Sequence, residues 1–172
     1  MAVRPICAYP ETVLRQKAKR VETIDDELQY LIDDMIETMY AAPGIGLAAP
    51  QVGLSLQLFV VDVTSGQDVN ALQTYINPEI VSAEGRIREE EGCLSVVGVT
   101  GMTPRAERVV LHGLNREGNP VEVAAEGLLA RAFQHEFDHL NGLLFFDRMG
   151  VVGRDLMKRK YKRAQQRRQQ HR

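Results

Sequence analysis

The sequence has no tryptophan, only two cysteines among its 172 residues, and no long hydrophobic run. A bilayer-spanning helix needs about 18 consecutive apolar residues, and no stretch approaches that length. Residues 1–10 lack the apolar core of a signal peptide. A chain of this size can build its core without disulfides, so Cys7 and Cys93 are expected to be free thiols in a reducing compartment. These absences argue against a membrane-spanning protein and a disulfide scaffold, and they favour an intracellular globular protein.

The net charge of −2 conceals an uneven distribution of charge along the chain. Residues 154–172 contain nine Lys and Arg and a single acid, Asp155, so this segment carries +8 and the remainder −10. A composition of 44% hydrophobic and 26% charged residues is that of a folded chain. We therefore expect one domain over residues 1–153, extended by a basic helical tail over 154–172. Such a tail suggests a nucleic-acid partner, and a merely solvated helix face is the alternative.

The order of the expected elements predicts an α+β fold. Hydrophobic periodicity predicts a first helix over 23–40, which Thr23 or Asp25 can cap. The glycine-rich segment 44–53 is expected to be a loop. A β-rich middle follows, with strands at 56–63, 74–76, 80–83, 86–90, 108–114 and 120–124. Two further helices are expected at 126–140 and 151–170. Because helices flank the strands instead of alternating with them, we expect small antiparallel β-sheets around a central helix, with a C-terminal helix.

The strongest motif is His135-Glu136-Phe137-Asp138-His139, an H-E-x-x-H in the helix expected at 126–140. Residues four apart lie one turn apart on one helix face, so His135 and His139 can bind one metal ion while Glu136 reaches a water on it. The alternative is a pair of core histidines beside a buried glutamate, which is costly unless all three groups find partners. The helix is apolar on more than one side, which is typical of a helix at the centre of its domain.

A catalytic metal site usually has three protein ligands and a water, so a third ligand is required. No glutamate follows Glu136, and position 145, where one protease pattern places a third histidine, is Phe145. The only later histidine is His171, in the basic tail. The third ligand must therefore lie upstream or be a later Asp. Cys93 is the upstream candidate, and from spacing alone a thiolate ligand and a buried structural thiol are equally good interpretations.

Three segments stand out when they are taken together: Gly-Ile-Gly-Leu-Ala-Ala-Pro-Gln-Val-Gly at 44–53, Glu-Gly-Cys-Leu-Ser at 91–95 and Gln-His-Glu-Phe-Asp-His-Leu at 134–140. In their order and spacing these segments resemble the peptide deformylase family. A weaker similarity runs from the N-terminus to about residue 148. The resemblance implies a catalytic domain that hydrolyses the formyl group of N-formylmethionine on nascent polypeptides and releases formate. It also implies Fe(II) as the metal in the cell, with Zn, Ni or Co in preparations, and a bacterial cytoplasmic or organellar location.

The resemblance assigns roles to matching positions. Cys93, His135 and His139 would bind the metal, which makes Cys93 the third ligand. Glu136 would be the general acid/base, with metal-bound hydroxide as the nucleophile. The side-chain amide of Gln51 and the backbone N–H of Leu94 would stabilise the oxyanion.

The same resemblance implies a substrate groove and an apolar pocket for the methionine side chain. The residues expected there are Ile45, Gly46, Leu128 and Ala132, beside His135. One departure from the family is Val97, which stands where Pro is usual. Losing Pro frees the backbone at position 97, so we expect a mobile loop over 97–102 and altered substrate affinity.

Several interpretations remain beside this one. Glu91 is expected to anchor the Cys93 segment, and Arg105 and Arg108 are expected to be solvated or ion-paired. The runner-up activity is an H-E-x-x-H metallopeptidase, against which the missing downstream ligand argues. A third hypothesis is a noncatalytic module that binds RNA or the ribosome through residues 154–172. The resemblance also implies that a basic tail can dock on the ribosome near the peptide exit, which is compatible with enzymatic activity.

Overall fold

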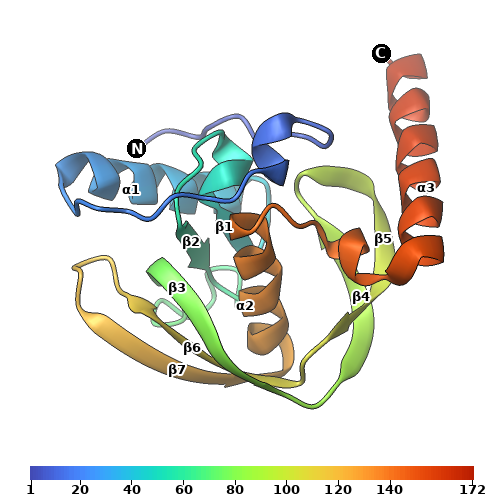
Figure 1. The fold of residues 1–172 in the computed structure, drawn as a ribbon. Helices are drawn as coiled ribbons and strands as arrows, with labels where there is room; N and C mark the ends of the chain where they lie inside the picture. The colour runs from blue at the N-terminus through green and yellow to red at the C-terminus, as the bar shows by residue number, and fades with distance from the viewer.

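A 14-residue helix, α2 (Gly127–Leu140), runs through the middle of the molecule, and two β-sheets and two other helices surround it (Figure 1). The computed structural model describes residues 1–172. The other helices are α1 (Asp26–Ala41) and α3 (Gly150–Gln170), with short 3-10 helices at Thr12–Arg15, Ala49–Val52 and Phe145–Arg148. The strands are β1 (Gly46–Ala48), β2 (Leu58–Val61), β3 (Gln73–Glu84), β4 (Ile87–Cys93), β5 (Val96–Arg105), β6 (Arg108–Leu114) and β7 (Pro120–Glu126).

Both sheets are antiparallel. The larger has the strand order β1-β2-β3-β6-β7, and the smaller is the β4–β5 hairpin. In Figure 1 the two sheets lie on different sides of α2. The α+β prediction, with antiparallel sheets around a central helix and a C-terminal helix, is therefore confirmed. None of the helices combines the length and the hydrophobicity that crossing a lipid bilayer requires.

Three local predictions were wrong. The segments 74–76 and 80–83 belong to one strand, β3, which is interrupted by a register shift after Ile76. Asn77 at this irregularity has a φ of 51°, and its side chain exchanges two hydrogen bonds with the backbone of Val21. The loop expected at 44–53 contains β1 and a 3-10 helix, and the loop expected at 97–102 lies within β5. In each case pairing with another strand decides whether the segment is extended.

The apolar sides of α1 and α2 pack against opposite faces of the larger sheet. The helix α1 begins after Asp25, whose carboxylate accepts a hydrogen bond from the Leu28 N–H, so Asp25 and not Thr23 is the cap. On α2, Phe133 contacts Phe59 and Tyr75 in an aromatic cluster with centroid separations of 5.2–6.2 Å. This packing fixes the rotation of α2, which turns its polar face toward the β4–β5 hairpin.

The C-terminal helix α3 is anchored to the body of the protein by its first half. Met157 and Tyr161 are buried in a cluster with Val96 and the aromatic residues of the preceding 3-10 helix. The Tyr161 hydroxyl also donates to the carbonyl of Tyr9. The helix is continuous across position 154, where the basic segment begins.

A buried ion network ties the β4–β5 hairpin to α2. Arg105 on β5 donates to both carboxylate oxygens of Glu91 at 2.8 and 2.9 Å, and to Asp138 on α2 at 2.6 Å. Arg148 completes the network by donating to both oxygens of Asp138. The side chains of Arg105, Glu91 and Asp138 are nearly inaccessible to solvent. The bidentate Arg105–Glu91 pair joins β5 to β4, and the Arg105–Asp138 contact fixes the hairpin relative to α2.

We expect Arg105→Met to lower the free energy of unfolding by roughly 3–5 kcal/mol, because it leaves the buried Glu91 carboxylate without a guanidinium and Asp138 with Arg148 alone. Urea unfolding at pH 7 measures the change. Arg108→Met is the matched control, because its side chain is 51% exposed and makes only 3.7 Å ion pairs. A similar loss in both variants would contradict a structural role for the network.

The lowered pKa of the Glu91 carboxyl predicts that the free energy of unfolding depends on pH. Burial alone would raise its pKa, but hydrogen bonds from Arg105 and His135 outweigh burial and lower the pKa from 4.5 to about 2. The unfolded state therefore takes up the proton first as the pH falls. The stabilisation is complete above about pH 5 and is lost on acidification toward about pH 2. We expect Glu91→Gln to be less stable than wild type at pH 7 and to lose less stability between pH 5 and 3; parallel curves would contradict this.

Candidate active site

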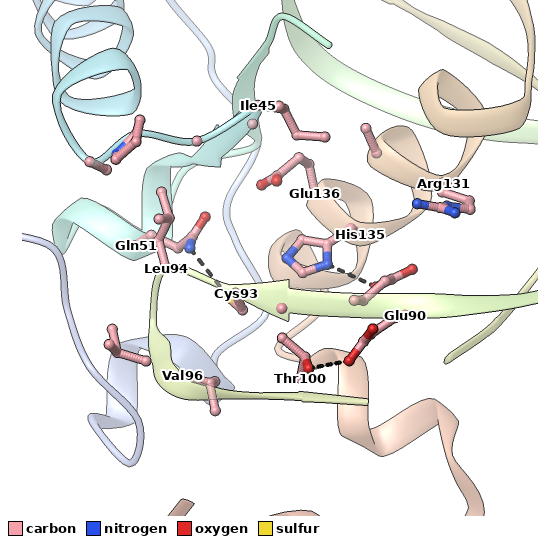
Figure 2. Close-up of a pocket in the computed structure, with 18 of the residues that line it drawn as sticks. Ile45, Gln51, Glu90, Cys93, Leu94, Val96, Thr100, Arg131, His135 and Glu136 are labelled. Carbon is pink, nitrogen blue, oxygen red and sulfur yellow. Dashed lines mark hydrogen bonds and ion pairs between the residues drawn. The ribbon is translucent and has the colours of Figure 1, made fainter. Parts of the chain in front are cut away.

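A cleft of about 620 Å³ opens between β1, the β4–β5 hairpin and α2 (Figure 2). It gathers residues from three parts of the sequence, 42–51, 90–100 and 128–136. The sequence-predicted residues in its lining are Ile45, Gly46, Gln51, Cys93, Leu94, Leu128, Ala132, His135 and Glu136. The remaining one, His139, is buried one turn further along α2, where its ring lies 5.0 Å from that of His135. The structure thus brings all the predicted site residues together.

Cys93, His135 and His139 form a group whose ligand atoms all lie within 4.8 Å of one another. The Cys93 Sγ and the His139 Nε2 are 3.4 Å apart. The H-E-x-x-H spacing puts both imidazoles on one face of α2, and the end of β4 supplies the thiol. A thiolate with two imidazoles suits borderline divalent transition metals, and three protein ligands leave a coordination position for water or substrate.

The surroundings of the two imidazoles fit a metal site. The His135 Nδ1 lies 3.1 Å from a Glu91 carboxylate oxygen, and this contact directs the other ring nitrogen away from Glu91, as in carboxylate–histidine–metal arrangements. Burial lowers the pKa of His139 well below its ordinary value, so its ring stays neutral, which is the form that ligates metals. Glu91 was expected only to anchor the Cys93 segment. Its contact with His135 adds a second role, the orientation of that ring.

Glu136 is 4% exposed, and its Oε2 makes no hydrogen bond within the protein. Burial raises the pKa of its carboxyl to about 7. A carboxyl group that titrates near neutral pH can both accept and return a proton. Close packing holds it in place, because a Cβ added at Gly46 would lie 2.5 Å from the Glu136 Oε1. Only glycine therefore permits β1 to approach this carboxylate so closely.

Two hydrogen-bond donors face the same region. The Gln51 Oε1 accepts from the Ala48 N–H at 3.0 Å, which orients the amide so that its Nε2 points to Cys93 Sγ at 3.6 Å and to Ser95 Oγ at 3.1 Å. The backbone N–H of Leu94, in the turn after β4, makes no hydrogen bond within the protein. Figure 2 shows Gln51 and Leu94 close to Cys93, across the cleft from His135 and Glu136.

Sequence reasoning did not single out two polar residues of this region. The Ser95 hydroxyl accepts a hydrogen bond from the Gln51 amide. In the sequence, only the position of Ser95 in the segment 91–95 could have indicated this role. Arg131 lines the cleft on α2. Its position four residues before His135 puts it on the metal-binding face, a signal that was present in the helical spacing.

Comparisons with known proteins agree with this geometry. A sequence model of the family described as Polypeptide deformylase matches residues 3–155. The peptide deformylase of Syntrophobacter fumaroxidans is 53% identical over 163 residues, covering 95% of this chain and 96% of that protein. The peptide deformylase of Thermodesulfovibrio yellowstonii is 51% identical and covers 94% and 98%.

Solved structures give the same result. A peptide deformylase from Legionella pneumophila superposes with a TM-score of 0.91 at 47% identity, covering 99% of both chains. A peptide deformylase from Synechococcus elongatus, in complex with actinonin, has a TM-score of 0.85 at 44% identity and covers 90% of this chain and 85% of that chain. Family match, near-complete coverage and the clustered metal-ligand set lead to one conclusion: the chain belongs to the peptide deformylase family.

Proposed function

We propose that this protein is a metal-dependent hydrolase that removes the N-formyl group from the methionine of nascent polypeptides and releases formate. The observation that carries the proposal is the grouping of Cys93, His135 and His139 beside the buried Glu136 in an open cleft. Formylated chains are made in the bacterial cytoplasm and in organelles, and the named relatives include bacterial proteins. We accordingly propose that the protein acts in one of these compartments.

Cys93, His135 and His139 would hold one divalent ion, which we propose to be Fe(II) in the cell, with Zn, Ni or Co able to take its place. When bound, such an ion polarises the formyl carbonyl and lowers the pKa of a coordinated water toward neutrality. The Glu91 carboxylate supports this assignment by orienting His135 from behind.

Glu136 is proposed as the general acid/base. Its unpartnered Oε2 can accept the proton of the attacking water and later deliver it to the nitrogen of the scissile amide, which cannot leave as an anion. Negative charge collects on the formyl oxygen when the water adds to the carbonyl carbon, before the C–N bond breaks. The Gln51 Nε2 and the Leu94 N–H are proposed to donate to that oxygen, and one such donor is worth about 3 kcal/mol of transition-state stabilisation.

The cleft wall formed by Ile45, Leu128 and Ala132 is proposed to hold the methionine side chain. The close approach of Gly46 to Glu136 leaves little room beside the reacting carbon, which favours formyl over larger acyl groups. A metallopeptidase remains the competing activity. It would cut internal bonds of unformylated peptides, whereas a deformylase would leave Met-Ala-Ser intact.

We expect Glu136→Ala to lower formate release from formyl-Met-Ala-Ser by about 100-fold or more, because the proton carrier is lost while the three ligands remain. The assay uses anaerobic, Fe(II)-loaded protein, and bound metal is quantified separately. Glu122→Ala, an exposed glutamate on β7, is the control. Undiminished activity in Glu136→Ala at full metal content would contradict the assigned role.

A second proposal concerns the basic tail over 154–172, which we propose to be an extension of the catalytic domain over 1–153. Arg159, Arg163 and Arg167 are exposed and recur every four residues, so they form one stripe on α3. We propose that this stripe docks on ribosomal RNA near the peptide exit. Deleting the tail would also remove Met157 and Tyr161 from a buried cluster, so charge removal is the cleaner test.

We expect the triple variant Arg159→Gln, Arg163→Gln and Arg167→Gln to bind ribosomes more weakly and with a shallower salt dependence, because fewer phosphate contacts release fewer counterions. Co-sedimentation with ribosomes at several salt concentrations measures this. Formate release from a free peptide serves as the folding control. Equal ribosome binding by the triple variant and the wild type would refute docking through this stripe.

A further inference from the structure

Arg131 stands on the wall of the cleft in the part proposed for the substrate's first side chain. It lies on α2 one turn before His135, beside Leu128 and Ala132, and it lines the same cleft. Figure 2 shows its guanidinium on the same side of the cleft as His135 and Glu136. A subsite otherwise walled by aliphatic side chains thus contains a cation.

The Arg131 guanidinium makes no hydrogen bond in the protein. Its Nε is buried without a partner, and the nearest carboxylate oxygen, on Glu89, lies 3.9 Å from Nη1. The side chain as a whole is only 19% exposed. The contrast with Arg105 is direct, because every nitrogen of that buried guanidinium has a carboxylate partner. A largely buried guanidinium whose only carboxylate neighbour lies beyond hydrogen-bond distance is poorly compensated, so a ligand that brings an acceptor would be favoured.

The dimensions of a formylmethionyl substrate match this position. Its thioether sulfur is five bonds from the formyl carbon. Arg131 and His135 are four residues apart, which corresponds to about 6 Å along the axis of α2. A side chain that runs along α2 from the reacting centre therefore reaches the level of Arg131, which lines the same cleft. Sulfur in a thioether is a weak acceptor, whereas the oxygen of a sulfoxide is a strong one.

We propose that Arg131 is a specificity-determining residue that donates a hydrogen bond to the acceptor at the tip of the substrate's first side chain. It selects methionine over aliphatic residues of the same shape and admits methionine sulfoxide. This inference rests on the proposed deformylase function. Norleucine has the shape of methionine without the acceptor, so it leaves the guanidinium desolvated and unpaired, and a site built for an acceptor discriminates against it.

The test compares kcat/KM for three peptides: formyl-Met-Ala-Ser, formyl-norleucyl-Ala-Ser, and formyl-Met-Ala-Ser oxidised to the sulfoxide. In the wild type we expect a preference for methionine over norleucine of about fivefold, the effect of one modest hydrogen bond, expressed mainly in KM. In Arg131→Leu this ratio should fall to near one. The kcat/KM for the sulfoxide peptide should fall about tenfold relative to wild type, because a charge-assisted hydrogen bond is lost. Arg88→Leu, an exposed arginine on β4 outside the cleft, should keep the wild-type ratios.

Ratios between isosteric substrates do not change when a residue merely supports the fold, so they separate specificity from stability. Unchanged ratios in Arg131→Leu, with formate still released, would overturn the role of Arg131 and leave the proposed function intact. No formate from any formylated peptide with wild-type protein would overturn the proposed function and this inference with it. Arg131→Met, which removes every donor nitrogen and keeps an unbranched side chain, gives the same comparison should the leucine variant fail to fold.

Discussion

The burial of polar groups along one face of α2 is the constraint on which the rest of the structure depends. Glu136 and His139 are 4% and 1% exposed, and Asp138 is buried beside them. Polar groups removed from water are costly unless they are paired. The β4–β5 hairpin offsets this cost by bringing Arg105 to Asp138 and the thiol of Cys93 to His139. The hairpin is therefore part of the chemistry and not only a cover for the helix.

The opposite face of α2 makes this arrangement rigid. Phe133 is held in an aromatic cluster with two residues of the larger sheet, so the helix cannot rotate without opening the core. The same sheet carries β1 at its edge, and Gly46 on β1 presses against Glu136. The two walls of the cleft, β1 and the β4–β5 hairpin, are thus both held against α2. A site built on packed helices and strands keeps its geometry better than a site on loops.

Local signals in the sequence predicted the features that local interactions decide. The helix expected at 23–40 is α1, and the motif at 135–139 stands on α2 with its histidines on one face. The strand β5 was missed because its glycines suggest a loop, and only pairing with β4 makes it a strand. Nothing in the neighbouring sequence separates Arg105 from Arg108, yet one is buried between two carboxylates and the other is exposed. Tertiary partners, which periodicity does not reveal, decide between them.

The packing of α3 bears on how the tail and the cleft are related. Tyr161 fixes the middle of the helix to the backbone of Tyr9, and the Gln165 amide donates to the carbonyl of Val97 on β5. Val97 itself lines the cleft. A surface carried by α3 is therefore held at a set orientation to the substrate cleft, whereas a flexible tail would provide only proximity. If the tail docks on a ribosome, this rigid connection would orient the cleft as well as concentrate the enzyme near its substrate.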